Sequence, residues 1–123
     1  MRYYFVFLRF EIFDYMIIFF ETKQNTVIAV QCAENPSEQD ITKFIWLFGN
    51  AKQIDSQSVE GCFFGPRREM ITPWSTNAVE ITQNMGIKGV VRIEQYFPVK
   101  ETDDSFDPML QAKYHNLDQN VFF

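Results

Sequence analysis

The chain has 123 residues, 46% of them hydrophobic, which is enough apolar material for one domain with its own core. Sixteen acidic residues against eleven basic ones give a net charge of -5, and the basic residues are scattered. This excludes a nucleic-acid platform, which needs clustered positive charge. The two cysteines, Cys32 and Cys62, and one histidine, His115, exclude a disulfide-stapled scaffold and a cysteine-rich zinc site, and they fit a reduced cytoplasmic compartment.

Residues 1–15 form an aromatic and aliphatic segment that Arg9, Glu11 and Asp14 interrupt. No stretch reaches the roughly 20 apolar residues that span a bilayer, so we expect no membrane association. The apolar part is also too short for a signal peptide, and no small-residue cleavage site follows it. Three interpretations stay open: an extra edge strand, a poorly ordered arm, or a translated leader before a natural start at Met16.

The first half of the chain predicts two strands and a helix. Residues 16–22 and 26–32 are short apolar runs joined by a polar turn. Ser37 opens a helix, with Asp40 at the spacing of a capping box, and Gly49 ends it. Apolar residues at helical spacing place one stripe of this helix against a sheet. They are Ile41, Phe44, Ile45 and Phe48.

The second half predicts two short strands, a helix and a long strand. Residues 52–55 and 58–64 read as a strand pair joined by a tight turn. Thr72 caps a helix over residues 74–85. Residues 90–99 form the clearest strand in the sequence, because its side chains alternate with a period of two.

The last part of the chain predicts a loop, a short helix and an uncovered apolar end. Residues 101–107 carry four acids and no basic residue, which is typical of a solvated loop rather than a metal cage. Asp107 and Pro108 are expected to begin the short helix. Residues 121–123 are apolar and would normally be covered, so we expect a truncated C-terminal end and self-association through exposed apolar ends.

The order of elements from residue 26 onward predicts the fold class. Strand, helix, strand, strand, helix, strand is the ferredoxin-like split βαβ arrangement of an α+β domain. Two helices would lie on one face of an antiparallel sheet, and residues 16–22 would add an extra N-terminal strand. No linker or repeat interrupts this order, so residues 16–123 are expected to form one domain.

No residue is expected to be catalytic. An activated thiol needs a histidine partner and a sharp turn, whereas Cys32 and Cys62 lie in apolar strands that favour small buried hydrophobes. His115 is expected to be a surface residue. All five glycines lie where the sequence predicts the ends or turns of helices and strands, so none of them belongs to a glycine-rich loop that could bind a phosphate. We therefore expect no catalytic, cofactor-binding or metal-ligating residue in this chain.

The most unusual segment covers residues 65–86 and reads GPRREMITPWSTNAVEITQNMG. Arg67 and Arg68 precede a helix N-terminus, where guanidinium groups and free N–H groups could hold an anion. The competing interpretation is an exposed loop whose arginines meet the chain's own acids, notably Glu69 and Glu80.

Trp74 begins the helix of this segment, and its indole has two interpretations. It anchors the helix against the sheet, or it forms a partner-binding lip together with Pro73, Ser75 and Thr76. The residues alone leave both open.

The segment resembles the N-terminal domain of large phosphoribosylformylglycinamidine synthases, the purine-biosynthetic amidotransferases, which carry GPRxGTxSPWSSKATDI and an Asn-x-Gly helix ending. The matching residues are Gly65, Pro66, Arg67, Ile71, Pro73, Trp74, Ser75, Ala78, Ile81, Asn84 and Gly86. The departures are Glu69 and Met70 for Gly-Thr, Thr72 and Thr76 for serines, Asn77 for lysine, and Val79 with Glu80 for Thr-Asp.

The resemblance covers Met16 to the end of the chain and looks closest to the enzymes of Bacteroides-like bacteria. It continues through residues 46–51, 90–98 and 107–114. Residues 1–15 match nothing, which favours the leader interpretation for them.

The resemblance implies a role in assembly. Family members convert formylglycinamide ribonucleotide, glutamine and ATP to the amidine, and a synthetase domain and a glutaminase domain follow this one. ATP and magnesium belong to the full-length enzyme. The first domain resembles the separate PurS subunit of other bacteria, which has a split βαβ fold and bridges synthetase and glutaminase. This chain alone would be non-catalytic, and its interface or substrate-side residues would be Arg67, Thr72, Pro73, Trp74, Ser75 and Asn77.

Two alternatives from other functional classes stay open. A freestanding regulatory module of ferredoxin-like fold would bind a small ligand, which would stabilise it. A dimerisation module would instead form an oligomer that depends on concentration.

Overall fold

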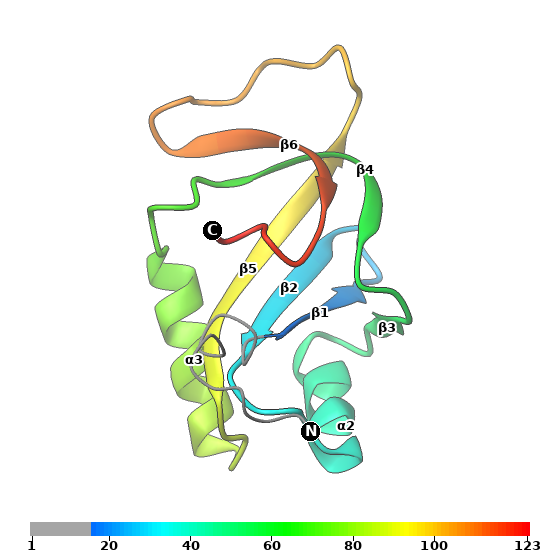
Figure 1. The fold of residues 1–123 in the computed structure, drawn as a ribbon, viewed down its shortest axis with the longest axis vertical. Helices are drawn as coiled ribbons and strands as arrows, with labels where there is room; N and C mark the ends of the chain where they lie inside the picture. The colour runs from blue at the N-terminus through cyan, green and yellow to red at the C-terminus, as the bar shows by residue number, and fades with distance from the viewer. Residues whose placement is uncertain (1–15) are drawn as a thin grey trace, which may run out of the picture.

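A computed structural model describes residues 16–123, and the interpretations of residues 1–15 lie outside the described residues. Six antiparallel strands form one sheet in the order β3-β1-β2-β5-β4-β6, and two helices pack on it (Figure 1). This confirms the predicted α+β class, consistent with a ferredoxin-like arrangement, and the extra N-terminal strand. The elements are β1 (Met16–Glu21), β2 (Val27–Cys32), α2 (Glu38–Leu47), β3 (Lys52–Ile54), β4 (Val59–Pro66), α3 (Pro73–Asn84), β5 (Val90–Val99) and β6 (Gln111–Leu117).

The first hairpin and helix form where local sequence signals predict them. Asn25 in the turn between β1 and β2 has a φ of 64°, a left-handed conformation that asparagine tolerates. Ser37 Oγ accepts a hydrogen bond from the Asp40 amide at 3.1 Å, and Asp40 Oδ2 accepts one from the Ser37 amide at 3.2 Å. This reciprocal capping box fixes the start of α2. Gly49, with a φ of 74°, follows its last turn.

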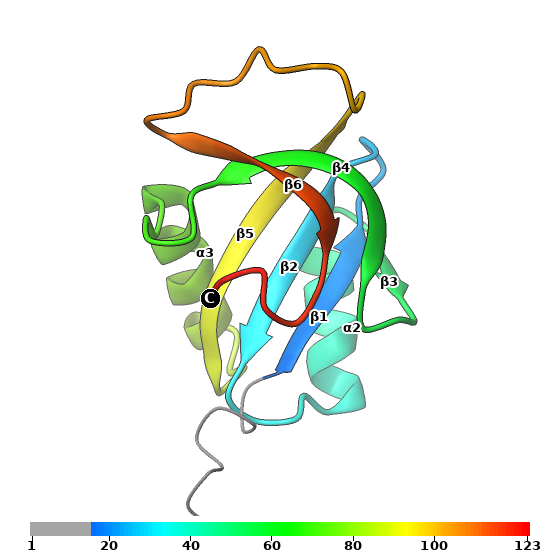
Figure 2. The ribbon, with the colours of Figure 1, turned by 45° about the horizontal axis from the view of Figure 1, so that its top comes forward.

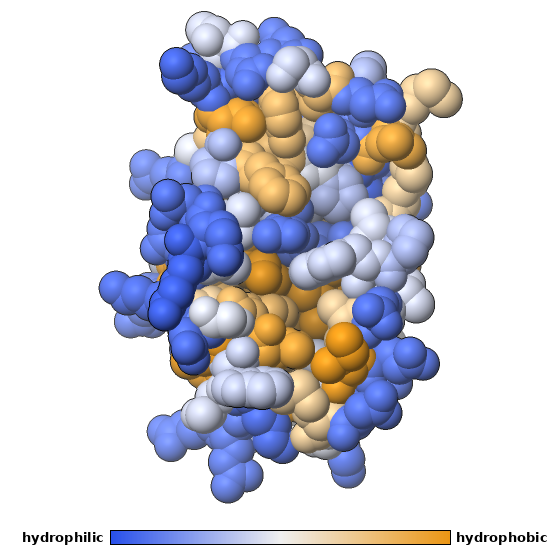
Figure 3. Space-filling model, turned by 180° about the vertical axis from the view of Figure 1, so that it is seen from behind, coloured by the Kyte–Doolittle hydropathy of each residue, from blue (hydrophilic) through white to orange (hydrophobic). Residues whose placement is uncertain are grey.

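Two apolar clusters lie on opposite faces of the sheet. The helices lie behind the sheet in Figure 2, whereas the C-terminal segment crosses in front of it. Phe20 belongs to the cluster under the helices and Phe19 to the opposite cluster, and both are 0% exposed. Seen from behind, apolar side chains gather in the lower centre between hydrophilic flanks (Figure 3). The central strands are thus covered on both faces.

The pairing of β3 and β4 differs from the predicted hairpin. β3 pairs with β1, whereas β4 pairs with β5 and β6. The turn between them therefore carries the chain from one edge of the sheet toward the other. The prediction was wrong because the sequence of a short strand does not encode which other strand it pairs with.

The helix expected at Asp107 and Pro108 is a single turn. The amides of Leu110 and Gln111 donate to the Asp107 carbonyl at 3.0 and 2.8 Å, and β6 begins immediately afterwards. Burial of Tyr114 in the second apolar cluster overrides the local helix-start signal. This prediction was wrong, because the tertiary partner of residues 111–117 decides their conformation.

Two of the three apolar residues at the C-terminal end are covered by the domain itself, which corrects the expectation of an exposed apolar end for Val121 and Phe122 but not for Phe123. Val121 and Phe122 are 1% and 7% exposed, whereas Phe123 is 61% exposed. The Phe122 ring centroid lies 4.6 Å from the guanidinium carbon of Arg92 on β5. Gln119 donates to the Ile17 carbonyl at 2.8 Å and accepts from the Ile17 amide at 2.7 Å, which ties the last turn to β1.

No helix in residues 16–123 has the length and apolar character needed to cross a bilayer.

The neighbouring phenylalanines at the C-terminal end allow a matched test of this packing. Phe122→Ala should lower the free energy of unfolding by about 3 kcal/mol, because it empties a buried aromatic site. Phe123→Ala should cost less than about 1 kcal/mol. Guanidinium denaturation followed by circular dichroism measures both, and equal costs would contradict the described packing of the C-terminal segment.

Candidate functional site

A buried ion pair on β5 holds the loop that precedes α3. Arg92 Nε lies 3.0 Å from Glu94 Oε2, and the two side chains are 5% and 1% exposed. The remaining nitrogens of Arg92 donate to the carbonyls of Arg68 at 2.8 Å, Met70 at 2.9 Å and Arg67 at 3.3 Å. One guanidinium thereby fixes the backbone of residues 67–70 against the sheet.

The same ion pair positions the start of α3. Glu94 accepts hydrogen bonds from Thr72 Oγ1 at 2.8 Å and from the Thr72 amide at 3.3 Å. Thr72 Oγ1 accepts from the Ser75 amide at 3.0 Å as the N-cap of the helix, as predicted. Ser75 is fully buried, and its Oγ accepts from the Ile93 amide at 3.1 Å. These two predicted site residues thus use their hydroxyls inside the domain.

The first residue of the unusual segment packs on a buried aromatic ring. A Cβ on Gly65 would overlap the ring of Tyr96, so only glycine fits there. Tyr96 packs edge-on against Tyr114 with ring centroids 5.3 Å apart, and Tyr114 donates to the Pro66 carbonyl at 2.5 Å. Burial raises the pKa of both tyrosines above the usual range.

The Arg67 side chain, 41% exposed, is paired at the surface. Its guanidinium lies 2.5 Å from Glu69 Oε2 and donates to the Pro108 carbonyl at 3.1 Å. The pKa of Glu69 is lowered, first by a hydrogen bond from its own backbone amide and then by the one from Arg67. The predicted meeting of this arginine with Glu69 is confirmed.

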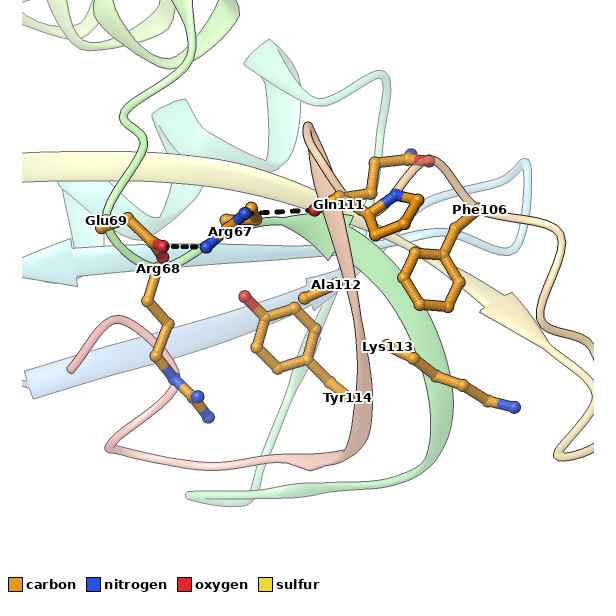
Figure 4. Close-up of a pocket in the computed structure, with 9 residues that line it drawn as sticks. Arg67, Arg68, Glu69, Phe106, Gln111, Ala112, Lys113 and Tyr114 are labelled. Atoms are coloured by element: carbon orange, nitrogen blue, oxygen red, sulfur yellow. Dashed lines mark hydrogen bonds and ion pairs between the residues drawn. The ribbon is translucent and has the colours of Figure 1, made fainter.

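A basic pocket of about 490 Å³ lies beside Arg67. Figure 4 shows that Arg67 turns toward Glu69, while Arg68 and Lys113 extend in other directions. Arg68 lies 5.1 Å above the Tyr114 ring and donates to a backbone carbonyl, and Lys113 pairs with an acid of the neighbouring loop. The three cations do not converge on one point, so the geometry does not favour the anion-binding interpretation.

An apolar groove of about 500 Å³ lies along the same segment. Its exposed apolar lining includes Trp74 (44% exposed), Ile71 (62%), Phe97 (46%) and Leu110 (57%), together with Pro73, and polar residues such as Gln95, Asp107 and Gln111 also border it. The indole of Trp74 is thus half-exposed at the wall of a groove that Pro73 also lines. The predicted lip does not include all four of its residues, because Ser75 is fully buried and Thr76 does not line the groove. Asn77 is exposed on α3 outside both cavities.

Sequence reasoning missed the buried Arg92–Glu94 ion pair and also a contact between a thiol and an imidazole. Cys62 Sγ lies 3.5 Å from His115 Nδ1, across β4 and β6. His115 is exposed as predicted, but Cys62 is half-buried rather than a core residue. Only a strand assignment for residues 111–117 would have placed the imidazole beside β4. Cys32 is buried as predicted.

Across residues 16–123, no three His, Cys, Asp or Glu side chains come together in a group that could hold a metal ion.

Two glutamates in ion pairs of different burial allow a test of the network. Glu94→Gln should lower the free energy of unfolding by about 3 kcal/mol, because it leaves the guanidinium of Arg92 buried without its counter-charge. Glu69→Gln removes an exposed partner and should leave the denaturation midpoint unchanged within error. A Glu94→Gln variant whose free energy of unfolding equals that of the unchanged chain would contradict the assigned role of this pair.

A family model described as "Formylglycinamide ribonucleotide amidotransferase N-terminal" matches residues 25–119. This range begins in the turn before β2 and includes both helices, the Arg92–Glu94 pair and the apolar groove. No curated protein is similar enough in sequence to match the chain. The family match spans most of the chain, and the protein therefore belongs to the family of formylglycinamide ribonucleotide amidotransferase N-terminal domains.

Proposed function

We propose that this chain is the assembly domain of a phosphoribosylformylglycinamidine synthase. That enzyme converts formylglycinamide ribonucleotide, glutamine and ATP to formylglycinamidine ribonucleotide in purine biosynthesis. In this proposal the domain contacts both the synthetase and the glutaminase domains in the cytoplasm and bridges them. ATP and magnesium bind to the full-length enzyme outside this chain, and the chain alone is inactive. Family membership supports the assignment to this enzyme, and the apolar groove is the observation that supports the assembly role.

The groove has the composition of a protein interface centre. Ile71, Trp74 and Leu110 expose large apolar surfaces around one cavity. Residues that dominate binding energy are commonly tryptophans in apolar pockets that a partner closes to water. The groove would therefore take an apolar segment of a neighbouring domain.

The groove is also preorganised. The backbone before Ile71 is fixed by Arg92, and Trp74 lies two residues after the helix N-cap Thr72, whose hydroxyl donates to Glu94. A rigid site loses little conformational entropy on binding, so more of the contact energy appears as affinity. Among the predicted site residues, Thr72 and Ser75 would hold the surface, Pro73 and Trp74 would form the contact, and Arg67 and Asn77 would flank it.

Complementation in trans tests the proposal. The whole chain is mixed with a synthase of this family that lacks its own N-terminal domain, and binding and amidine formation from glutamine are measured. The chain should bind and restore activity. Trp74→Ala should weaken binding about 30-fold, as expected for a residue that contributes about 2 kcal/mol.

Trp46→Ala is the matched control, because Trp46 is 69% exposed on α2, away from the groove. Its affinity should stay within about twofold of the unchanged chain. Equal losses in the two variants would contradict the assignment of the groove. A folded chain that neither binds nor restores activity would instead favour a freestanding ligand-binding or dimerisation module.

A further inference from the structure

A thiol and an imidazole face each other on strands β4 and β6. Cys62 and His115 occupy directly opposed positions of this antiparallel pair, and Sγ lies 3.5 Å from Nδ1. Directly opposed side chains project from the same face of a sheet. The strand register therefore sets their proximity.

The backbone beside both residues departs from regular strand geometry. The β4–β6 register shifts between Val59 and Cys62, Gly61 has a φ of 130° and Asn116 has a φ of 68°. The Gly61 amide donates to Asn116 Oδ1 at 2.9 Å, which connects the two irregular positions. Bulges of this kind re-aim side chains and are common beside functional sites.

The surroundings of Cys62 differ from those of the other cysteine. Cys62 is a free, half-buried thiol whose direct partner on β5 is the apolar Val99 and whose partner on β6 is the exposed His115. Cys32 is 2% exposed, and burial raises the pKa of its thiol to about 12. A reagent in water can reach Cys62, whereas Cys32 is protonated and covered.

We propose that Cys62 and His115 form a reactive thiol site that low-molecular-weight disulfides modify. His115 accepts the thiol proton, and the Cys62 thiolate attacks one sulfur of the disulfide. A bond forms between Cys62 Sγ and that sulfur, the reagent's own S–S bond breaks, and the leaving group departs as a thiolate. The proton on His115 passes to this thiolate when it is basic and to water when it is not. The products are one mixed disulfide on the protein and one small thiol, so the exchange needs no other oxidant. Cys62 lines neither cavity, and the site is independent of the assembly role.

Ellman's reagent, an aromatic disulfide that releases a coloured thiolate, tests this site on the folded whole chain. One equivalent should be released rapidly and a second only after denaturation in guanidinium. Peptide mass spectrometry should place the fast modification on Cys62. Cys62→Ser should lose the fast phase and keep the slow one, and a fast phase that persists in this variant would overturn the proposal.

The role of the imidazole is tested with His115→Gln, which keeps a polar side chain but removes the base. The fast phase should slow about tenfold at neutral pH, because a thiol without a neighbouring base is only a few per cent thiolate there. Lys113→Gln removes a positive charge from the same strand and should change the rate less than about threefold. Thermal melting confirms that each variant is folded. A folded His115→Gln variant that reacts at the unchanged rate would overturn the role of His115.

Discussion

The Arg92–Glu94 ion pair is the interaction on which the shape of the loop before α3 depends. Taking two charges out of water costs several kcal/mol for each ion unless their hydrogen-bonding groups are satisfied. Here three backbone carbonyls and one carboxylate satisfy the guanidinium, and Thr72 satisfies the carboxylate. The groups that hydrogen-bond to the ion pair all come from residues 67–72. The loop must therefore keep this arrangement for the two buried charges to stay hydrogen-bonded.

This constraint links the buried core to the exposed surface. The loop carries Ile71, and the helix that follows carries Trp74, so both reach the groove from a backbone that the sheet holds in place. Gly65 and Tyr96 fix the other end of the segment, because no larger residue fits over the ring. The exposed residues of the groove can therefore vary without disturbing the fold, whereas the residues beneath them cannot.

Local signals were sufficient for much of the fold. The capping residues Ser37 and Thr72 mark both helix starts, and the alternation in residues 90–99 marks β5. The same alternation could not show which face is covered. In β5, Arg92 and Glu94 are buried while Val91 and Phe97 are 44% and 46% exposed, because distant segments cover the polar face.

The candidate site was predictable only in part for the same reason. The motif residues stand together in the sequence, and their N-cap could be recognised from Thr72 alone. The partners that give them their roles, such as Glu94 and Leu110, come from other elements. Contacts of this kind depend on strand pairing, which the sequence of a single segment does not encode.

The link between Gln119 and Ile17 joins residues 102 positions apart. During synthesis β1 leaves the ribosome long before the turn that completes its hydrogen bonds, and one face of the central strands stays without Val121 and Phe122 until those residues have been made. Pairings of such long range close slowly, because most of the chain must be ordered first. Folding of this domain is therefore expected to finish only when its last turn has been made, with an apolar sheet face open to other proteins until then.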